Sequence, residues 1–203
     1  MPLYKNIKSE KYSEAAIWHI TEPEHFFSDQ LGFSTQKKLE KRRLEFLATR
    51  LLLQQTIPGF PFEKMAIAAT GKPFLHGTPY HFSISHSFPY VAVAFSERSV
   101  GIDVQVFQPK ISRLKDKFLS VAEQKWFADS MEKLTLAWTA KEAAYKRLEK
   151  NGVDFIRDLS IRDFHMQGNA AFFEMECFRN ADTGSILTLN GQLENGFAWT
   201  VTQ

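Results

Sequence analysis

Helical and strand patterns occur in separate runs along this chain of 203 residues, and the order of helix followed by several strands occurs twice. A parallel sheet would require single strands to alternate with single helices along the sequence. The observed order instead favours an α+β fold with mainly antiparallel sheets. We therefore predict two similar α+β halves in one chain, residues 1–99 and 100–203.

Periodicity and turn residues predict the individual elements. Thr21 and Glu24 have the spacing of a capping box at the start of a short helix, and Asn151-Gly152 should end the last helix. The longer predicted helices carry apolar residues three and four positions apart and cover 34–56, 111–119, 121–129 and 132–150. The predicted strands are short alternating segments bounded by turn residues: 3–9, 15–20, 65–69, 79–85, 90–96, 100–107, 159–165, 171–178, 185–189 and 197–202.

Composition narrows the class of protein. The only cysteine is Cys177, so an intrachain disulfide is excluded, and its alternating surroundings predict a half-buried structural thiol rather than a nucleophile. No apolar run approaches the roughly 20 residues that span a membrane, and the first residues lack the apolar core of a signal peptide. The net charge of +2 is too small to indicate nucleic-acid binding. We expect a cytoplasmic monomer that binds neither membrane nor nucleic acid.

Basic residues concentrate on the helix predicted at residues 34–56. They outnumber the two acidic residues there, Glu40 and Glu45. Such a stripe suits a phosphate group or an acidic partner protein, although a solvated helix face has the same pattern. The basic residues are Lys37, Lys38, Lys41, Arg42, Arg43 and Arg50.

An acidic residue interrupts the apolar strand predicted at residues 100–107. Asp103 and Gln105 are two residues apart, so both side chains should lie on one face of the strand. A carboxylate in an apolar strand is costly unless it is paired with a cation. Asp103 is therefore either a salt-bridged structural residue or a metal ligand.

The segment LAWTAKEAAYK, residues 136–146, places Trp138, Glu142 and Lys146 one helical turn apart at the edge of the buried face. Glu142 and Lys146 are an ordinary surface ion pair by spacing alone. If Glu142 approaches Asp103, however, the two carboxylates require a divalent cation between them. A ligand set made only of oxygen atoms favours Mg²⁺.

Potential phosphate-binding groups lie between residues 71 and 87. Lys72 occupies a Gly-Lys-Pro turn, and Ser85, His86 and Ser87 end a strand as a cluster of donors. A satisfied structural histidine is the alternative interpretation of His86. A Ser-His-acid hydrolase is disfavoured, because the glycines of a nucleophile elbow do not surround either serine.

Taken together and in this order, the segments GKP, FSISHS, GIDVQ, FLSVAE and LAWTAKEAAYK resemble the Sfp-type 4′-phosphopantetheinyl transferases. Members of this family move phosphopantetheine from coenzyme A to a serine of an apo acyl or peptidyl carrier protein and leave adenosine 3′,5′-bisphosphate. The resemblance implies a fold of two similar α+β halves, with coenzyme A and Mg²⁺ in the cleft between them.

The resemblance also implies roles for individual residues. Asp103 and Glu142 would hold Mg²⁺, and Gln105 replaces an acidic residue of many relatives, which predicts weaker metal binding. Lys146 would add positive charge at the transferring phosphate. Glu142 or Glu123 would accept the serine proton, and we favour Glu142 because Glu123 has the spacing of a capping box with Ser120. The residues expected to contact coenzyme A phosphates are Lys41, Arg50, Lys72, Ser85 and His86.

Two other functions are compatible with part of the pattern. A Mg²⁺-dependent nuclease or phosphodiesterase also uses Asp, Glu and Lys around phosphate, but restriction-type nucleases commonly carry Glu-x-Lys on a strand, whereas Glu142 and Lys146 have helical spacing. A non-catalytic module that binds coenzyme A or a carrier protein is the second alternative.

Overall fold

The computed structural model describes residues 3–8, 13–178 and 185–203. Within these residues every strand pairing is antiparallel, which confirms the predicted α+β class. The first sheet has the order β1-β2-β6-β5 and consists of β1 (Leu3–Lys8), β2 (Ser13–His19), β5 (His81–Ser87) and β6 (Tyr90–Ser96). The second has the order β7-β11-β10-β9-β8 and consists of β7 (Ile102–Val106), β8 (Leu159–Gln167), β9 (Ala170–Cys177), β10 (Ser185–Glu194) and β11 (Phe197–Thr202).

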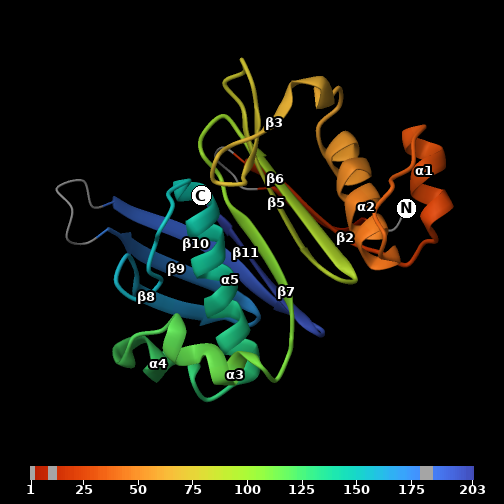
Figure 1. Cartoon of the computed structure of the whole chain (residues 1–203). Helices are drawn as coiled ribbons and strands as arrows, with labels where there is room; N and C mark the ends of the chain where they lie inside the picture. Colours follow the sequence, from red (N-terminus) through yellow and green to blue (C-terminus); the bar gives the residue numbers. More distant parts are fainter. Residues whose placement is uncertain (1–2, 9–12, 179–184) are drawn as a thin grey trace.

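The helices lie on the outer faces of these sheets (Figure 1). Helices α1 (Glu24–Leu31) and α2 (Glu40–Thr56) cover the first sheet, and α5 (Met131–Leu148) crosses the second. Shorter elements connect them: the 3₁₀ turns η1 (Phe62–Lys64) and η2 (Lys115–Lys117), the hairpin of β3 (Met65–Ile67) and β4 (Pro73–Leu75), α3 (Ile111–Leu114) and α4 (Val121–Phe127). No helix in the described part of the chain is both long and apolar enough to span a membrane.

The inner faces of the two sheets pack against each other. Along β2, Ala15 and Ile17 contact the second sheet, whereas Ala16 and Trp18 face α1 and α2. This alternation follows from the two-residue period of a strand with both faces buried. The sheets meet in an apolar cluster of Ala15, Ile17, Ala92, Ala94, Val100, Ile102, Val104, Phe197, Trp199 and Val201.

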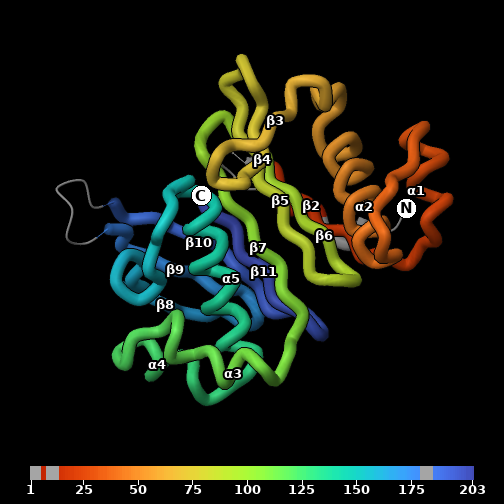
Figure 2. The backbone as a smooth tube through the Cα atoms, in the orientation of Figure 1, coloured from red at the N-terminus to blue at the C-terminus, as the bar shows by residue number. Residues whose placement is uncertain are grey.

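A ladder of serine hydroxyls joins β5 to β7, which run side by side in Figures 1 and 2. Strand β7 is the edge of its sheet, so the backbone N–H groups on its open side need acceptors. Ser83, Ser85 and Ser87, on one face of β5, accept these bonds at 3.1–3.2 Å. The donors are the N–H groups of Ile102, Val104 and Val106. We call this contact the serine ladder.

Gly101 lets α5 approach the start of β7. A Cβ atom at this position would lie 1.9 Å from the carbonyl oxygen of Ala143, so any larger residue would collide with the helix backbone. Ser99, two residues earlier, donates a hydrogen bond of 2.6 Å to the carbonyl oxygen of Arg147. The last two turns of α5 are thereby held against the residues that lead into β7.

Several predicted boundaries are wrong. Helix α2 begins at Glu40 rather than near residue 34. The predicted capping box between Thr21 and Glu24 does not form. The Thr21 N–H donates instead to the carboxylate of Glu22, and helix α1 has Pro23 as its N-cap, without a side-chain hydrogen bond. Helix α5 ends at Leu148 because Glu149 already has left-handed backbone geometry with φ 55°. The division into halves at residue 99 and their mutual likeness stay predictions.

Candidate functional site at the junction of the sheets

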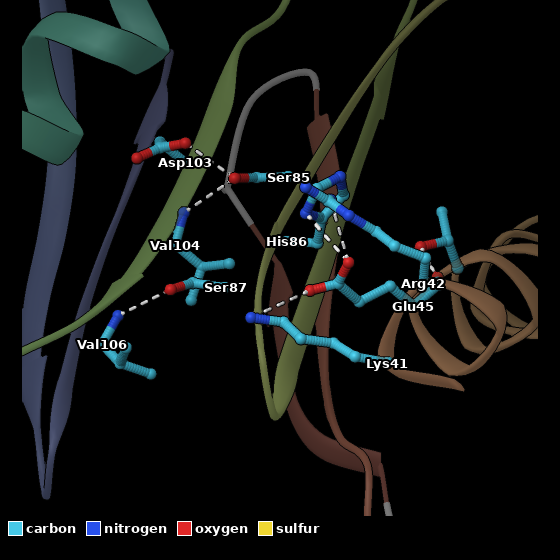
Figure 3. A network of polar contacts seen from close by, with 10 residues as sticks. Lys41, Arg42, Glu45, Ser85, His86, Ser87, Asp103, Val104 and Val106 are labelled. Atoms are coloured by element: carbon cyan, nitrogen blue, oxygen red, sulfur yellow. Dashed lines mark hydrogen bonds and ion pairs between the residues drawn. The ribbon is translucent and has the colours of Figure 1, made fainter. Parts of the chain in front are cut away.

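Asp103 lies on β7 where the two sheets meet α5. Its side chain is buried, and its Oδ1 atom accepts hydrogen bonds from Ser85 Oγ at 2.6 Å and from Lys146 Nζ at 2.7 Å. Ser85 therefore acts twice, since the same hydroxyl accepts the Val104 N–H of the serine ladder (Figure 3). The carboxylate is fixed by one group from each of two other elements.

Helix α5 brings Lys146 and Glu142 to the same place. Lys146 Nζ also donates to the carbonyl oxygen of Ile102 at 3.0 Å, so its ammonium group is tied to β7 by two bonds. Glu142 lies within electrostatic range of Asp103, because the charge of Asp103 contributes to the raised pKa of Glu142. The four-residue spacing of Glu142 and Lys146, which is also that of a surface ion pair, here places both side chains on the side of α5 that faces β7.

The Glu142 carboxyl is the electrostatically unusual group of the site. Burial, and next the negative charge of Asp103, raise its pKa to about 7, while Lys146 acts in the opposite direction. Near neutral pH a large fraction of Glu142 is therefore protonated in the absence of a bound cation. An additional positive charge between the two carboxylates would favour the ionised form.

The oxygen atoms present at this site fit Mg²⁺. Gln105 lies on the same face of β7 as Asp103, and its amide nitrogen donates to the Val106 carbonyl at 3.2 Å, so the amide oxygen is the atom with which it would bind a cation. The described residues contain no group of three or more His, Cys, Asp or Glu side chains placed to hold a metal. Two carboxylates and one amide oxygen form the partial, oxygen-only set with which Mg²⁺ retains waters and binds substrate phosphates.

Lys72 extends from the Gly-Lys-Pro turn to the C-terminal end of α5. Its Nζ atom donates to the Lys146 carbonyl at 2.8 Å and to Glu149 Oε1 at 2.6 Å, where an ammonium group satisfies an otherwise unpaired helix carbonyl. A cavity of about 230 Å³ lies beside this contact. Its lining residues are Thr70, Gly71, Lys72, Pro73, Ser83, Ile84, Tyr145, Lys146, Glu149 and Lys150.

Ser85, His86 and Ser87 do not form the single donor cluster that the sequence suggested. Ser85 and Ser87 are buried and face β7, whereas His86 is exposed on the opposite face of β5, toward α2 (Figure 3). Consecutive strand residues point to opposite faces, so only two of the three can share a side. The roles of Ser85 and His86 in binding coenzyme A stay predictions.

The remaining predicted phosphate contacts lie on α2. Lys41 Nζ lies 3.9 Å from Glu45 and 5.6 Å from the centre of the Phe88 ring. Arg50 stacks on Phe46, with its guanidinium carbon 3.3 Å from the ring centre, and burial lowers its pKa to about 10. Lys41 and His86 both contact Glu45, a residue that the sequence analysis did not assign to the site.

Glu123 has a structural role. It forms the predicted capping box with Ser120, and its Oε1 atom also accepts the Ile161 N–H at 2.8 Å. The same oxygen pairs at 2.8 Å with Lys141, whose side chain is completely buried. The sequence analysis missed this ion pair, although Lys141 stands beside Glu142 in the motif. Both oxygens of Glu123 are engaged, which favours Glu142 as the candidate base.

Trp138 packs against aromatic side chains, and Cys177 is a structural thiol as its strand pattern predicted. The Trp138 ring lies 5.2 Å from Phe118 and 5.6 Å from Phe155, measured between ring centres, so it joins α5 to the loops beneath it. Cys177 is fully buried in β9, and burial raises the pKa of its thiol to about 11. A thiol protonated at neutral pH is inert as a nucleophile.

The coupling between Asp103 and Glu142 predicts a measurable pKa change. In Asp103→Asn, the Glu142 pKa should fall from about 7 but stay above its ordinary value of 4.5, because burial is the larger cause and persists. Carbon-13 NMR titration of the glutamate carboxyl groups measures this pKa. Asp129→Asn, at an exposed position of the same formal charge, should leave it unchanged. An unaltered Glu142 pKa in Asp103→Asn would show that the two carboxylates are independent.

Sequence comparisons agree with this arrangement. Residues 99–201 match the family model described as the 4′-phosphopantetheinyl transferase superfamily. The 4′-phosphopantetheinyl transferase AcpT of Salmonella typhi is 34% identical over 115 residues, which cover 52% of this chain and 59% of that protein. The chain thus spans less than two thirds of the length of the curated relative that it matches. The matched family segment contains β7 and α5, the elements that carry Asp103, Glu142 and Lys146. The chain belongs to the 4′-phosphopantetheinyl transferase superfamily.

Proposed function

We propose that this protein transfers 4′-phosphopantetheine from coenzyme A to a serine of an apo acyl or peptidyl carrier protein. The observation that carries the proposal is the meeting of Asp103, Glu142 and Lys146 beside the serine ladder. Family membership and the activity for which the Salmonella typhi relative is named support it. We further propose that the protein is of the Sfp type and acts as a cytoplasmic monomer.

Mg²⁺ would be held by Asp103 and Glu142, with Gln105 as a neutral third ligand. When bound, it would supply positive charge that stabilises the pyrophosphate oxygens and the leaving group. Lys146 is placed to add a second positive charge, because its ammonium group already lies against Asp103 Oδ1. Lys72, Ser85, His86, Arg50 and Lys41 are the proposed contacts for coenzyme A phosphates.

The transfer is a substitution at one phosphorus atom. The carrier serine oxygen forms a bond to the phosphorus that bears pantetheine, and the bond from that phosphorus to the bridging oxygen breaks. Adenosine 3′,5′-bisphosphate leaves with the bridging oxygen and its electron pair. Phosphoryl transfer depends mainly on alignment and charge stabilisation, which are what this set of side chains supplies.

Glu142 is the proposed acceptor of the serine proton. A base must be ionised to accept a proton, and a cation bound beside Glu142 would offset the burial and the Asp103 charge that raise the Glu142 pKa to about 7. The competing residue, Glu123, is bound to Lys141 and to two backbone N–H groups. Glu123 is committed to these structural contacts, so Glu142 is the carboxylate that we propose as the base.

The mass of an apo carrier protein tests the function. After incubation with this protein, coenzyme A and Mg²⁺, the carrier should gain one phosphopantetheine group on its serine. Asp103→Ala and Glu142→Ala should each slow the transfer by about 100-fold or more, because each removes a proposed ligand of the cation that would stabilise the reacting phosphate. Intact-protein mass spectrometry follows the reaction.

Asp129→Ala is the matched control, since it removes an exposed carboxylate far from β7 along the chain. Unchanged mass with several carriers from fatty-acid, polyketide and peptide synthesis would contradict the proposal. Binding of coenzyme A without transfer would identify a non-catalytic module. Cleavage of a phosphodiester that depends on Asp103 would identify the nuclease alternative.

The double role of Ser85 gives a second test. Ser85→Ala should raise the Mg²⁺ concentration for half-maximal activity by about tenfold, because a residue that orients a metal ligand affects metal affinity on this scale. Ser87→Ala loses the same kind of ladder bond, 3.1 Å to Val106 N–H, but no contact with Asp103. Its half-maximal concentration should stay within about twofold of the wild type. Equal shifts in both variants would contradict a role of Ser85 in orienting Asp103 and leave it only its bond to the Val104 N–H.

A further inference from the structure

A buried carboxylate lies beneath a group of basic side chains between α2 and β5 (Figure 3). Glu45 is 3% exposed. Its Oε2 atom lies 3.1 Å from Arg42 Nη1 and 3.6 Å from His86 Nδ1, and its Oε1 atom lies 3.9 Å from Lys41 Nζ. The basic side chains themselves remain about half exposed, at 43–57%. We call these three the basic cluster.

The arrangement is unlike a simple surface ion pair. Exposed lysine and arginine side chains usually sample many rotamers, and fixing them when a ligand binds costs entropy. Here one buried acid contacts three basic side chains that come from two elements, α2 and β5. The carboxylate is inaccessible, while the basic ends stay open to solvent. The basic cluster is therefore already ordered before an anion arrives.

The basic cluster borders the proposed transfer site. His86 follows Ser85 on β5, and Ser85 holds Asp103 from the other face of the same strand (Figure 3). The positive charge of Lys146 also acts on His86. A phosphate-bearing molecule that lies across the edge of β5 would contact both groups of residues.

We propose that Glu45 is a positioning residue that orders Lys41, Arg42 and His86 into one binding site for a phosphate group of coenzyme A. The inference rests on the proposed function, because it takes coenzyme A as the ligand. On α2, Lys41 and Arg42 would then be the residues that contact this phosphate group, and Glu45 would influence the affinity for coenzyme A. Glu45 would act only through these three side chains and would touch no reacting atom.

Glu45 has two opposing effects on the affinity for an anion. Its own charge repels a phosphate group. Its charge also favours the protonated, cationic form of His86, against burial and the charges of Arg42 and Lys146, which lower the His86 pKa. Removal of Glu45 would therefore release the basic side chains from their common contact and lower the His86 pKa further. Weaker binding is the expected net result.

Direct binding measurements without a carrier protein test the inference. Glu45→Gln should bind coenzyme A about tenfold more weakly than the wild type by titration calorimetry, the scale of one lost charge-assisted contact. Glu40→Gln removes a negative charge from an exposed position of the same helix and should bind as the wild type does. The His86 pKa, measured by NMR, should fall in Glu45→Gln and not in Glu40→Gln.

A second ligand and a second variant distinguish the possible results. The same titration with 3′-dephospho-coenzyme A identifies the phosphate: a defect confined to coenzyme A indicates the 3′-phosphate, and an equal defect for both ligands indicates the pyrophosphate. Unchanged or tighter binding by Glu45→Gln would overturn the positioning role alone. No binding of coenzyme A by the wild type would overturn the proposed function as well. If Glu45→Gln does not fold, Glu45→Asp withdraws the charge from the basic cluster, and unchanged affinity in that variant would also contradict the role.

Discussion

The open edge of β7 is the constraint on which the site depends. An edge strand buried against another sheet must find acceptors for its backbone N–H groups, and here serine hydroxyls of β5 supply them. A hydroxyl can accept one bond and donate another. Ser85 uses its second capacity to hold Asp103, so the contact that joins the sheets also orients the central carboxylate. Stability and site geometry are coupled through one atom.

The charges of the site are balanced in a way that leaves room for a ligand. Lys146 forms an ion pair with Asp103. Burial, and next the negative charge of Asp103, raise the pKa of Glu142. On the other face of β5, buried Glu45 contacts the basic side chains of Lys41, Arg42 and His86, which stay about half exposed. One side of the strand is thus arranged for a cation and the other for an anion, as a metal-bound diphosphate with a further phosphate group would require.

Sequence patterns predicted the parts of this site that depend on local periodicity. The two-residue spacing of Asp103 and Gln105, the four-residue spacing of Glu142 and Lys146, and the Ser120–Glu123 capping box all follow from the geometry of one strand or helix. The meeting of Asp103 with Glu142 required the family resemblance as well, because it joins residues on different elements.

The missed features are tertiary contacts or competing local interactions. Glu45 lies on the apolar side of α2 among Leu44 and Ala48, and this position was a signal in the sequence that its burial would need partners. The serines at alternate positions of β5 were a second signal, since three hydroxyls on one buried strand face require a common partner. The early end of α5 at Glu149 was not visible, because its carboxylate is bound by Lys72 from the other half of the sequence.

The central claim is that coenzyme A and a divalent cation meet where β5, β7 and α5 come together. Diffraction from crystals grown with coenzyme A and Mn²⁺, recorded at the manganese absorption edge, tests it most directly. The account predicts one anomalous peak in contact with carboxylate oxygens of Asp103 and Glu142 and with the pyrophosphate, and a phosphate group on the basic cluster. A manganese ion bound elsewhere, or coenzyme A bound away from β5, would contradict it.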